Sequence, residues 1–270
     1  MRYDFDMKPN QVVLYMDILG FKEAIKNIKK PKSDESKDDV QLNFQWLNEL
    51  IHDEMNASKD CIKFLFVSDS LILSTGIENI NQLLEKMFKL QHILICSDFV
   101  VRGAICIGDL YHEKNMCGEP YICAIELEEN KCIYPRILIS IDDFEKLNIS
   151  EEYLKYFVDD FKMPIYKYID PISYEIENII KISKNNSQYD IWATLNRIIS
   201  LIEQQCIDNK DNKRVLEKWK WLAGVFITVL QNNKSDISDL LNKSTTAKIR
   251  KGSFKQCLER LQKVYNEMQN

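Results

Sequence analysis

The chain has 270 residues, of which 45% are hydrophobic and 29% are charged, as is typical of a globular protein. Its formal net charge of −5 argues against a broad nucleic-acid-binding face, so we expect no nucleic-acid partner. No stretch approaches the roughly 18 apolar residues that a membrane-spanning helix needs. The N-terminus also lacks a signal-peptide pattern. We therefore expect a cytoplasmic protein with no membrane partner.

The eight cysteines and three histidines show no pattern of a zinc site or a disulfide framework. No two cysteines are spaced as Cys-x-x-Cys, and most lie in apolar surroundings. We expect them to be small core residues. The low numbers of glycine (seven) and proline (six) favour long regular elements.

Strand-like and helix-like segments alternate over residues 1–172, which we assign to a first domain. Short apolar runs predict strands at residues 11–17, 61–67, 71–74, 99–107, 137–141, 156–158 and 165–169. Apolar positions spaced by three and four predict helices at residues 21–28, 40–55, 80–93, 118–128 and 142–147, with a polar loop at 29–39.

The order strand, helices, strand–hairpin–strand, helix, strand predicts an α+β fold of the ferredoxin-like, or split βαβ, type. Such a fold has an antiparallel sheet with helices on one face, and its first strand lies beside the central hairpin. Asp17 ends the first strand, and Asp69 lies in the hairpin turn. The topology therefore predicts that the two carboxylates meet and hold a divalent metal. The alternative is that each aspartate only occupies a strand-ending turn, where this residue is common.

Residues 173–270 have only helical periodicity and form a predicted helical C-terminal domain. Apolar stripes at residues 176–180, 191–202, 216–229 and 253–264 are separated by polar loops at 184–188, 208–212 and 232–235. No glycine-rich loop or metal-ligand spacing is present. We expect this domain to pack on the sheet domain or to form a dimer.

Five motifs follow one another in the first half of the chain: YMDILGF (15–21), VSDS (67–70), VRGAICIG (101–108), GEPYICAIELE (118–128) and PRILIS (135–140). In this order they resemble motifs of the class III nucleotide cyclases, the adenylate/guanylate cyclase fold. The resemblance is closest to the bacterial pyrimidine cyclases of the Pycsar antiphage systems, which make cyclic UMP or cyclic CMP. It leaves UTP and CTP as alternative substrates.

The resemblance implies a homodimer with active sites at its interface and two Mg²⁺ or Mn²⁺ ions in each site. Asp17, Asp69 and the backbone carbonyl of Ile18 are the implied metal ligands. The ions serve attack of the ribose 3′-hydroxyl on the α-phosphate, with pyrophosphate leaving.

The remaining candidate residues would contact the nucleotide. Arg102, in the strand beside the metal ligands, is the first candidate to bind the leaving pyrophosphate, and a solvated arginine is its alternative. Arg136 is the second candidate, with an ion pair to Glu126 or Glu128 as its alternative. Either the pair Phe64 and Phe66 or Leu65 lines the base pocket, because the pair and Leu65 face opposite sides of a strand, and core packing is the alternative for the phenylalanines. Backbone amides at the start of a helix would hold phosphate oxygens, and these belong to Leu19, Gly20 and Phe21.

Three positions depart from the pattern of the purine cyclases. Leu65 stands where those enzymes have a base-reading Lys or Glu, and Ile122 and Glu126 stand where they have the transition-state Asn and Arg. A catalytically inactive, nucleotide-binding cyclase relative is therefore an alternative function. Two others are a ferredoxin-like polymerase and a plain interaction module. Such polymerases carry an acidic pair within the hairpin, whereas this hairpin has one carboxylate, Asp69.

We expect His112 to be a surface or interface residue.

Overall fold

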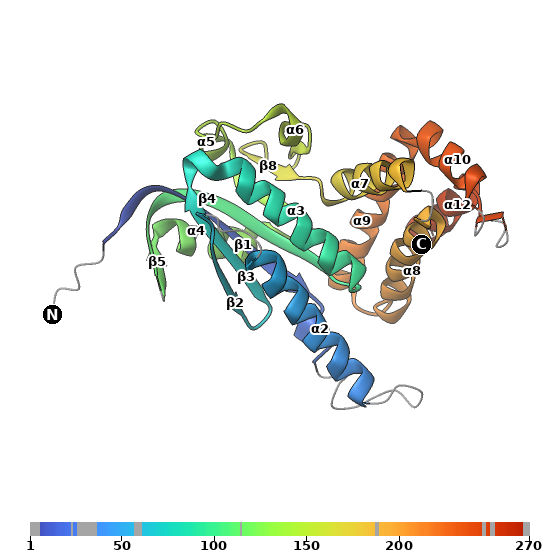
Figure 1. Cartoon of the computed structure of the whole chain (residues 1–270), viewed down its shortest axis with the longest axis horizontal. Helices are drawn as coiled ribbons and strands as arrows, with labels where there is room; N and C mark the ends of the chain where they lie inside the picture. Colours follow the sequence, from blue (N-terminus) through green and yellow to red (C-terminus); the bar gives the residue numbers. More distant parts are fainter. Residues whose placement is uncertain are drawn as a thin grey trace. The chain divides into compact units, whose positions relative to one another are not determined.

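The computed structural model describes residues 6–22, 24–25, 37–56, 61–113, 115–186, 189–244, 247–248 and 252–266. The chain divides into two compact units, Met1–Asp170 and Pro171–Asn270. Figure 1 shows the sheet and its helices in the first unit and the helical elements of the second. Each unit is described by itself below.

One sheet organises the first unit. Its strands are β1 (Lys8–Leu19), β2 (Lys63–Val67), β3 (Ser70–Gly76), β4 (Val100–His112), β5 (Met116–Gly118), β6 (Ile137–Ser140), β7 (Phe157–Asp159) and β8 (Tyr166–Ile169). Their order is β2-β3-β1-β4-β6-β8-β7, with β5 paired to β4.

The first four strands have the ferredoxin-like order, which confirms the predicted fold class. β1 lies between β3 and β4, β2 pairs with β3, and all three pairings are antiparallel. The β4–β6 pairing is parallel, because α4 (Glu119–Lys131) carries the chain back between these strands. The sheet is therefore antiparallel in its core and mixed beyond it.

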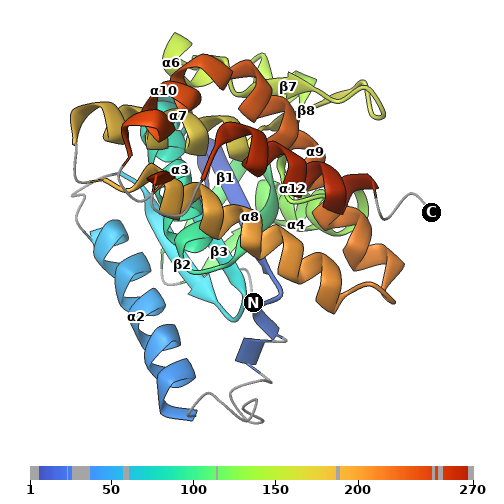
Figure 2. The same ribbon diagram turned by 90° about the vertical axis from the view of Figure 1, so that its right-hand side faces the viewer.

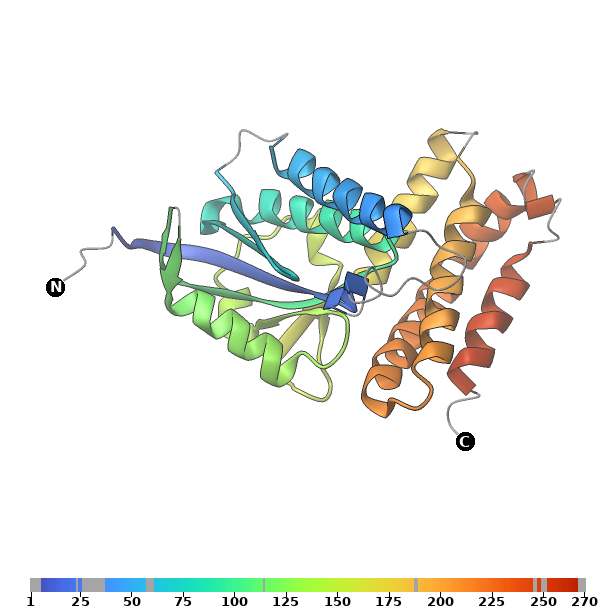
Figure 3. The same ribbon diagram turned by 90° about the horizontal axis from the view of Figure 1, so that it is seen from below.

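Helices cover both faces of the sheet (Figure 3). α2 (Lys37–Asn56) and α3 (Ile80–Cys96) lie on one face, and α4 lies on the other. The prediction of helices on one face therefore describes the split βαβ core but omits α4. Because both faces are covered, β1 is buried on both sides, which explains its continuous apolar run: Val12, Val13 and Leu14 are all fully buried.

The remaining elements of this unit are short: η1 (Ile77–Asn79), α5 (Ile141–Phe144) and α6 (Glu151–Leu154). The predicted helix at 21–28 is described only at residues 21, 22, 24 and 25, which are helical. Most of the predicted loop at 29–39 lies outside the described residues. Its last part is wrong, because α2 begins at Lys37.

The second unit consists of helices (Figure 2): α7 (Pro171–Asn185), α8 (Ile191–Asp208), α9 (Lys213–Asn232), α10 (Lys234–Lys243) and α12 (Phe254–Asn266). The predicted loop at 232–235 is wrong. A single residue, Asn233, separates α9 from α10, because it ends one helix and begins the next. Among the described residues, no helix has the length and apolar character needed to cross a membrane.

Candidate active site

Asp17 and Asp69 lie at the same end of neighbouring strands. Asp17 is paired in register with Ser70, the first residue of β3. The next residue of β1, Ile18, donates its amide to the carbonyl oxygen of Asp69 at 2.8 Å. This backbone bond ties the hairpin turn to the end of β1, and the structure thereby brings the two predicted acidic residues together.

The turn that carries Asp69 is a tight two-residue hairpin. Ser68 and Asp69 connect β2 to β3, and Ser68 has φ 60°, whereas Asp69 is not among the positive-φ residues. Positive φ at the first turn residue alone is the pattern of a type II′ turn, whose twist matches that of the strands it joins. The register of the hairpin therefore sets the position of the Asp69 backbone.

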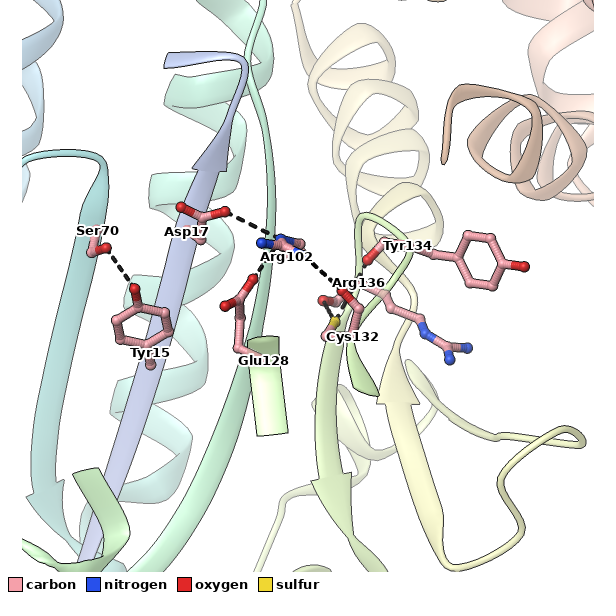
Figure 4. Close-up of polar contacts among 8 residues, drawn as sticks. All are labelled: Tyr15, Asp17, Ser70, Arg102, Glu128, Cys132, Tyr134 and Arg136. Atoms are coloured by element: carbon pink, nitrogen blue, oxygen red, sulfur yellow. Dashed lines mark hydrogen bonds and ion pairs between the residues drawn. The ribbon is translucent and has the colours of Figure 1, made fainter. Parts of the chain in front are cut away.

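Arg102 joins Asp17 to a third carboxylate (Figure 4). Its Nε lies 3.1 Å from Oδ2 of Asp17 and 2.5 Å from Oε1 of Glu128, and its Nη1 donates to the carbonyl of Cys132 at 3.3 Å. Arg102 is opposite Asp17 in the β1–β4 register. As expected, it is beside the candidate metal ligands, but two carboxylates share its guanidinium.

Glu128 is a site residue that the sequence analysis considered only as a partner of Arg136. It lies on α4, and its side chain is only 2% exposed. Burial of a carboxylate is costly unless a cation compensates it, and Arg102 supplies that charge. The available signal was periodicity, since Glu128 follows the buried helix positions Ala124 and Leu127.

The hydroxyl of Tyr15 lies close enough to these carboxylates for their charge to affect its pKa. It is hydrogen-bonded to the Ser70 hydroxyl at 2.7 Å. Burial raises the pKa of Tyr15, and the negative charges of Asp17, Glu128 and Asp69 raise it further. All three carboxylates therefore lie near enough to act on the Tyr15 hydroxyl, whereas its hydrogen bond with Ser70 lowers the pKa.

Arg136 does not reach this region. Its Nη2 lies 2.5 Å from Oδ2 of Asp160, and the two side chains are 5% and 4% exposed. Its guanidinium is 4.8 Å from the ring centre of Tyr168 and 5.4 Å from that of Tyr134. The side chain points away from Arg102 (Figure 4). The predicted pairing with Glu126 or Glu128 is wrong, and burial against Asp160 argues against the predicted phosphate contact.

Leu65 and Phe66 face opposite sides of the sheet, as expected. Leu65 packs against the cluster beneath α4. Phe66 lines an open cavity of about 320 Å³ with Phe21, Leu47 and Ser68. The Phe66 and Phe21 rings meet edge to face, with centroids 6.4 Å apart. Of the two candidates, Phe66 is thus the one beside a cavity, and this cavity adjoins the Asp69 turn.

The segment 19–21 turns the chain out of the sheet. β1 ends at Leu19, and Gly20 has φ 82°, a conformation that is strained for other residues. The carbonyl of Gly20 accepts the amide of Ala24 at 3.0 Å, as in a helical turn. The ring of Phe21 packs on Phe99 as well as Phe66. The predicted contact of these three amides with phosphate stays a prediction.

Three further expectations concern residues away from the aspartates. His112 is only 7% exposed, and its Nδ1 lies 2.5 Å from the Ser74 hydroxyl, so its predicted surface position is wrong. Burial, aided by Lys63, lowers the pKa of His112 to about 4. Ile122 and Glu126 both lie exposed on α4.

The donor set at the two aspartates fits a hard divalent cation. Two carboxylates and a backbone carbonyl, that of Ile18, are the oxygen ligands that Mg²⁺ and Mn²⁺ prefer. Within the described part of the chain, no group of three or more His, Cys, Asp or Glu side chains could hold a metal. A metal bound at Asp17 and Asp69 would therefore need further ligands, for which substrate phosphates are suited.

Comparisons with known proteins show likeness in structure only. No protein-family model matches the chain, and no curated protein matches it in sequence. The adenylyl cyclase CyaB from P. aeruginosa is similar over 61% of this chain and 96% of its own, with 15% identity and a TM-score of 0.40.

Two structures of bacterial light-regulated adenylyl cyclases match 62% of this chain, each with 10% identity and a TM-score of 0.40. The matches span 53% and 54% of those proteins, about half of their length. The fold assignment above rests on the strand order of this chain.

Proposed function

We propose that the chain is a nucleotide cyclase that converts UTP or CTP to the 3′,5′-cyclic monophosphate and pyrophosphate. One observation carries the proposal: Asp17 and Asp69 lie side by side, joined through the 2.8 Å bond between the Ile18 amide and the Asp69 carbonyl. The ordered series of cyclase-like motifs along residues 15–140 supports it.

Asp17, Asp69 and the Ile18 carbonyl would hold two Mg²⁺ or Mn²⁺ ions together with the triphosphate. When bound, such ions lower the pKa of the attacking 3′-hydroxyl and neutralise the phosphates. Arg102, beside Asp17, adds a fixed positive charge near the leaving pyrophosphate. Its ion pair with Glu128 would keep that charge in place if Asp17 bound a metal.

The cavity lined by Phe21 and Phe66 is our candidate base pocket. Aromatic walls stack on any nucleobase, so they fix the plane of the base without identifying it. Leu65, at the base-reading position of the purine cyclases, packs toward α4 and has no polar group to contact a purine. The choice of a pyrimidine base rests on this departure at Leu65 and on the family resemblance, and the antiphage signalling role rests on the resemblance alone.

We propose that two chains form the functional unit. Ile122 is 56% exposed on α4, and Glu126 is exposed on the same helix. In the resembling family these positions hold the transition-state Asn and Arg, and the active site forms between two protomers. Neither side chain donates a hydrogen bond to phosphate, so other groups must stabilise the transition state.

The loss of those donors favours a second candidate, an inactive relative that binds a pyrimidine nucleotide and signals without turnover. One experiment distinguishes the two candidates. The chain is incubated with each of the four nucleoside triphosphates and Mn²⁺ or Mg²⁺, and the products are analysed by mass spectrometry. The enzyme hypothesis predicts cyclic UMP or cyclic CMP from the wild type and none from Asp69→Asn. Binding of UTP or CTP without any cyclic product would favour the inactive relative.

A further inference from the structure

Arg102 is shared unequally between two carboxylates. Its Nε is 2.5 Å from Glu128 and 3.1 Å from Asp17. Glu128 is 2% exposed, whereas Asp17 is 18% exposed. Nε donates a hydrogen bond to Asp17, the candidate metal ligand, and its shorter contact with the more buried Glu128 is an ion pair (Figure 4).

The two partners differ in what they lose when Arg102 moves. Removing a cation from a carboxylate as buried as Glu128 is costly, so burial favours keeping its contact with Arg102. Asp17 has an alternative, because a divalent cation would replace the guanidinium and satisfy the carboxylate more strongly. The arrangement therefore favours replacement of the guanidinium by a cation at Asp17, while the guanidinium stays beside Glu128.

We propose that Glu128 is a positioning residue that anchors Arg102 and so allows Asp17 to exchange the guanidinium for a divalent cation. The inference rests on the proposed function, because it concerns the same metal site. Arg102 competes with the metal for Asp17. Glu128 limits that competition by holding the guanidinium against α4. Glu128 thereby sets the affinity of the site for metal without touching the metal.

The inference predicts that the single substitution weakens Mn²⁺ binding and that the added second substitution restores it. Glu128→Gln removes the anchor charge, and Arg102 then pairs fully with Asp17, so the affinity for Mn²⁺ falls. Arg102→Met in the Glu128→Gln background removes the competitor together with its anchor. Mn²⁺ affinity should then return to the wild-type level or exceed it. A merely structural role of Glu128 predicts no such rescue.

Mn²⁺ binding without nucleotide, followed by electron paramagnetic resonance of the free ion, tests this in the full chain. We expect the dissociation constant to rise about tenfold in Glu128→Gln, the effect of one strengthened charge-assisted contact at Asp17. The matched control is Glu129→Gln, an exposed neighbour on the same helix, with no change expected. Thermal unfolding of every variant separates loss of fold from loss of affinity.

The outcomes are distinct. An unchanged dissociation constant in Glu128→Gln, or a folded double variant as weak as Glu128→Gln, overturns the inference while leaving the proposed function intact. Absence of Mn²⁺ binding in the wild type without nucleotide also overturns the inference, whereas the proposed function, in which the triphosphate supplies further ligands, is tested separately by product formation.

Discussion

The amide of Ile18 donates to the carbonyl of Asp69 at 2.8 Å, so the end of β1 and the β2–β3 turn are joined by their backbones. This bond extends the register in which Asp17 faces Ser70. The relative position of the two candidate metal ligands is therefore determined by strand pairing rather than by a flexible loop. Side-chain substitutions at either aspartate should leave that backbone arrangement unchanged.

The first prediction is that Asp17→Asn and Asp69→Asn each abolish cyclase activity, by about a thousandfold or more, as expected for loss of a metal ligand. Each amide keeps the size of the carboxylate but loses its charge. Cyclic nucleotide formation measures the loss, and circular dichroism checks that the fold is kept. Asp109→Asn, an exposed position elsewhere on β4, is the control and should remain active.

The second prediction concerns the buried ion pair of Arg136 and Asp160. Arg136→Met should lower the free energy of unfolding by about 3–5 kcal/mol, because it leaves a buried carboxylate without its cation. Urea denaturation measures the change. Lys89→Gln, which breaks a half-exposed helix pair with Glu85 and a longer contact with Glu54, should cost less than about 1 kcal/mol. Equal costs for the two variants would refute the assignment of Arg136 to the core.

The third prediction is a pH dependence of stability that originates at His112. Its pKa of about 4 in the folded chain lies below its ordinary value of 6.5, so the unfolded chain binds the proton more readily. The contribution of a neutral His112 is complete above pH 6.5 and is lost as the pH falls toward 4. Other groups titrate in the same range, so the comparison must be made with a variant.

His112→Gln should be less sensitive to acid than the wild type over this range. Denaturation at a series of pH values measures the difference between the two unfolding free energies. A difference that does not change between pH 6.5 and pH 4 would contradict the assignment.

The fourth prediction compares two glycines, Gly20 just after β1 and Gly103 within β4. A Cβ at Gly20 would have no atom within 4 Å, so Gly20→Ala should cost only the strain of φ 82°, about 1–2 kcal/mol. Gly20→Asn should cost less, because Asn tolerates this conformation. A Cβ at Gly103 would lie 2.1 Å from the backbone oxygen of Tyr15, so Gly103→Ala should disrupt the β1–β4 pairing. Thermal unfolding should show the smallest loss of stability for Gly20→Asn, a larger loss for Gly20→Ala and the largest for Gly103→Ala.

Local sequence patterns predicted the elements that depend on local properties. The apolar run before Asp17 and the short turn around Asp69 were enough to predict a strand and a hairpin, and chain order then made the two carboxylates neighbours. Arg136 could not be assigned in this way, because its partner Asp160 comes from the distant β7–β8 connection. The burial of His112 likewise depends on Ser74, a residue of another strand.

Glu128 shows the same limit within the candidate site. Its periodicity places it on the buried side of α4, but only the packing of α4 against the sheet decides which cation it meets. The sequence analysis offered Arg136 as that cation, and the structure pairs Glu128 with Arg102. Residues that act through tertiary ion pairs are therefore the ones that pattern analysis assigned least well.

The most direct test of the proposed function is the ratio of cyclic nucleotide to pyrophosphate formed from UTP and from CTP with Mn²⁺. Both products can be measured in one reaction, with the Asp69→Asn variant run in parallel. We predict one cyclic UMP or cyclic CMP for each pyrophosphate released, and neither product from the variant. Release of inorganic phosphate with a nucleoside diphosphate, or no turnover of any nucleotide by the wild type, would contradict the assignment of this chain as a nucleotide cyclase.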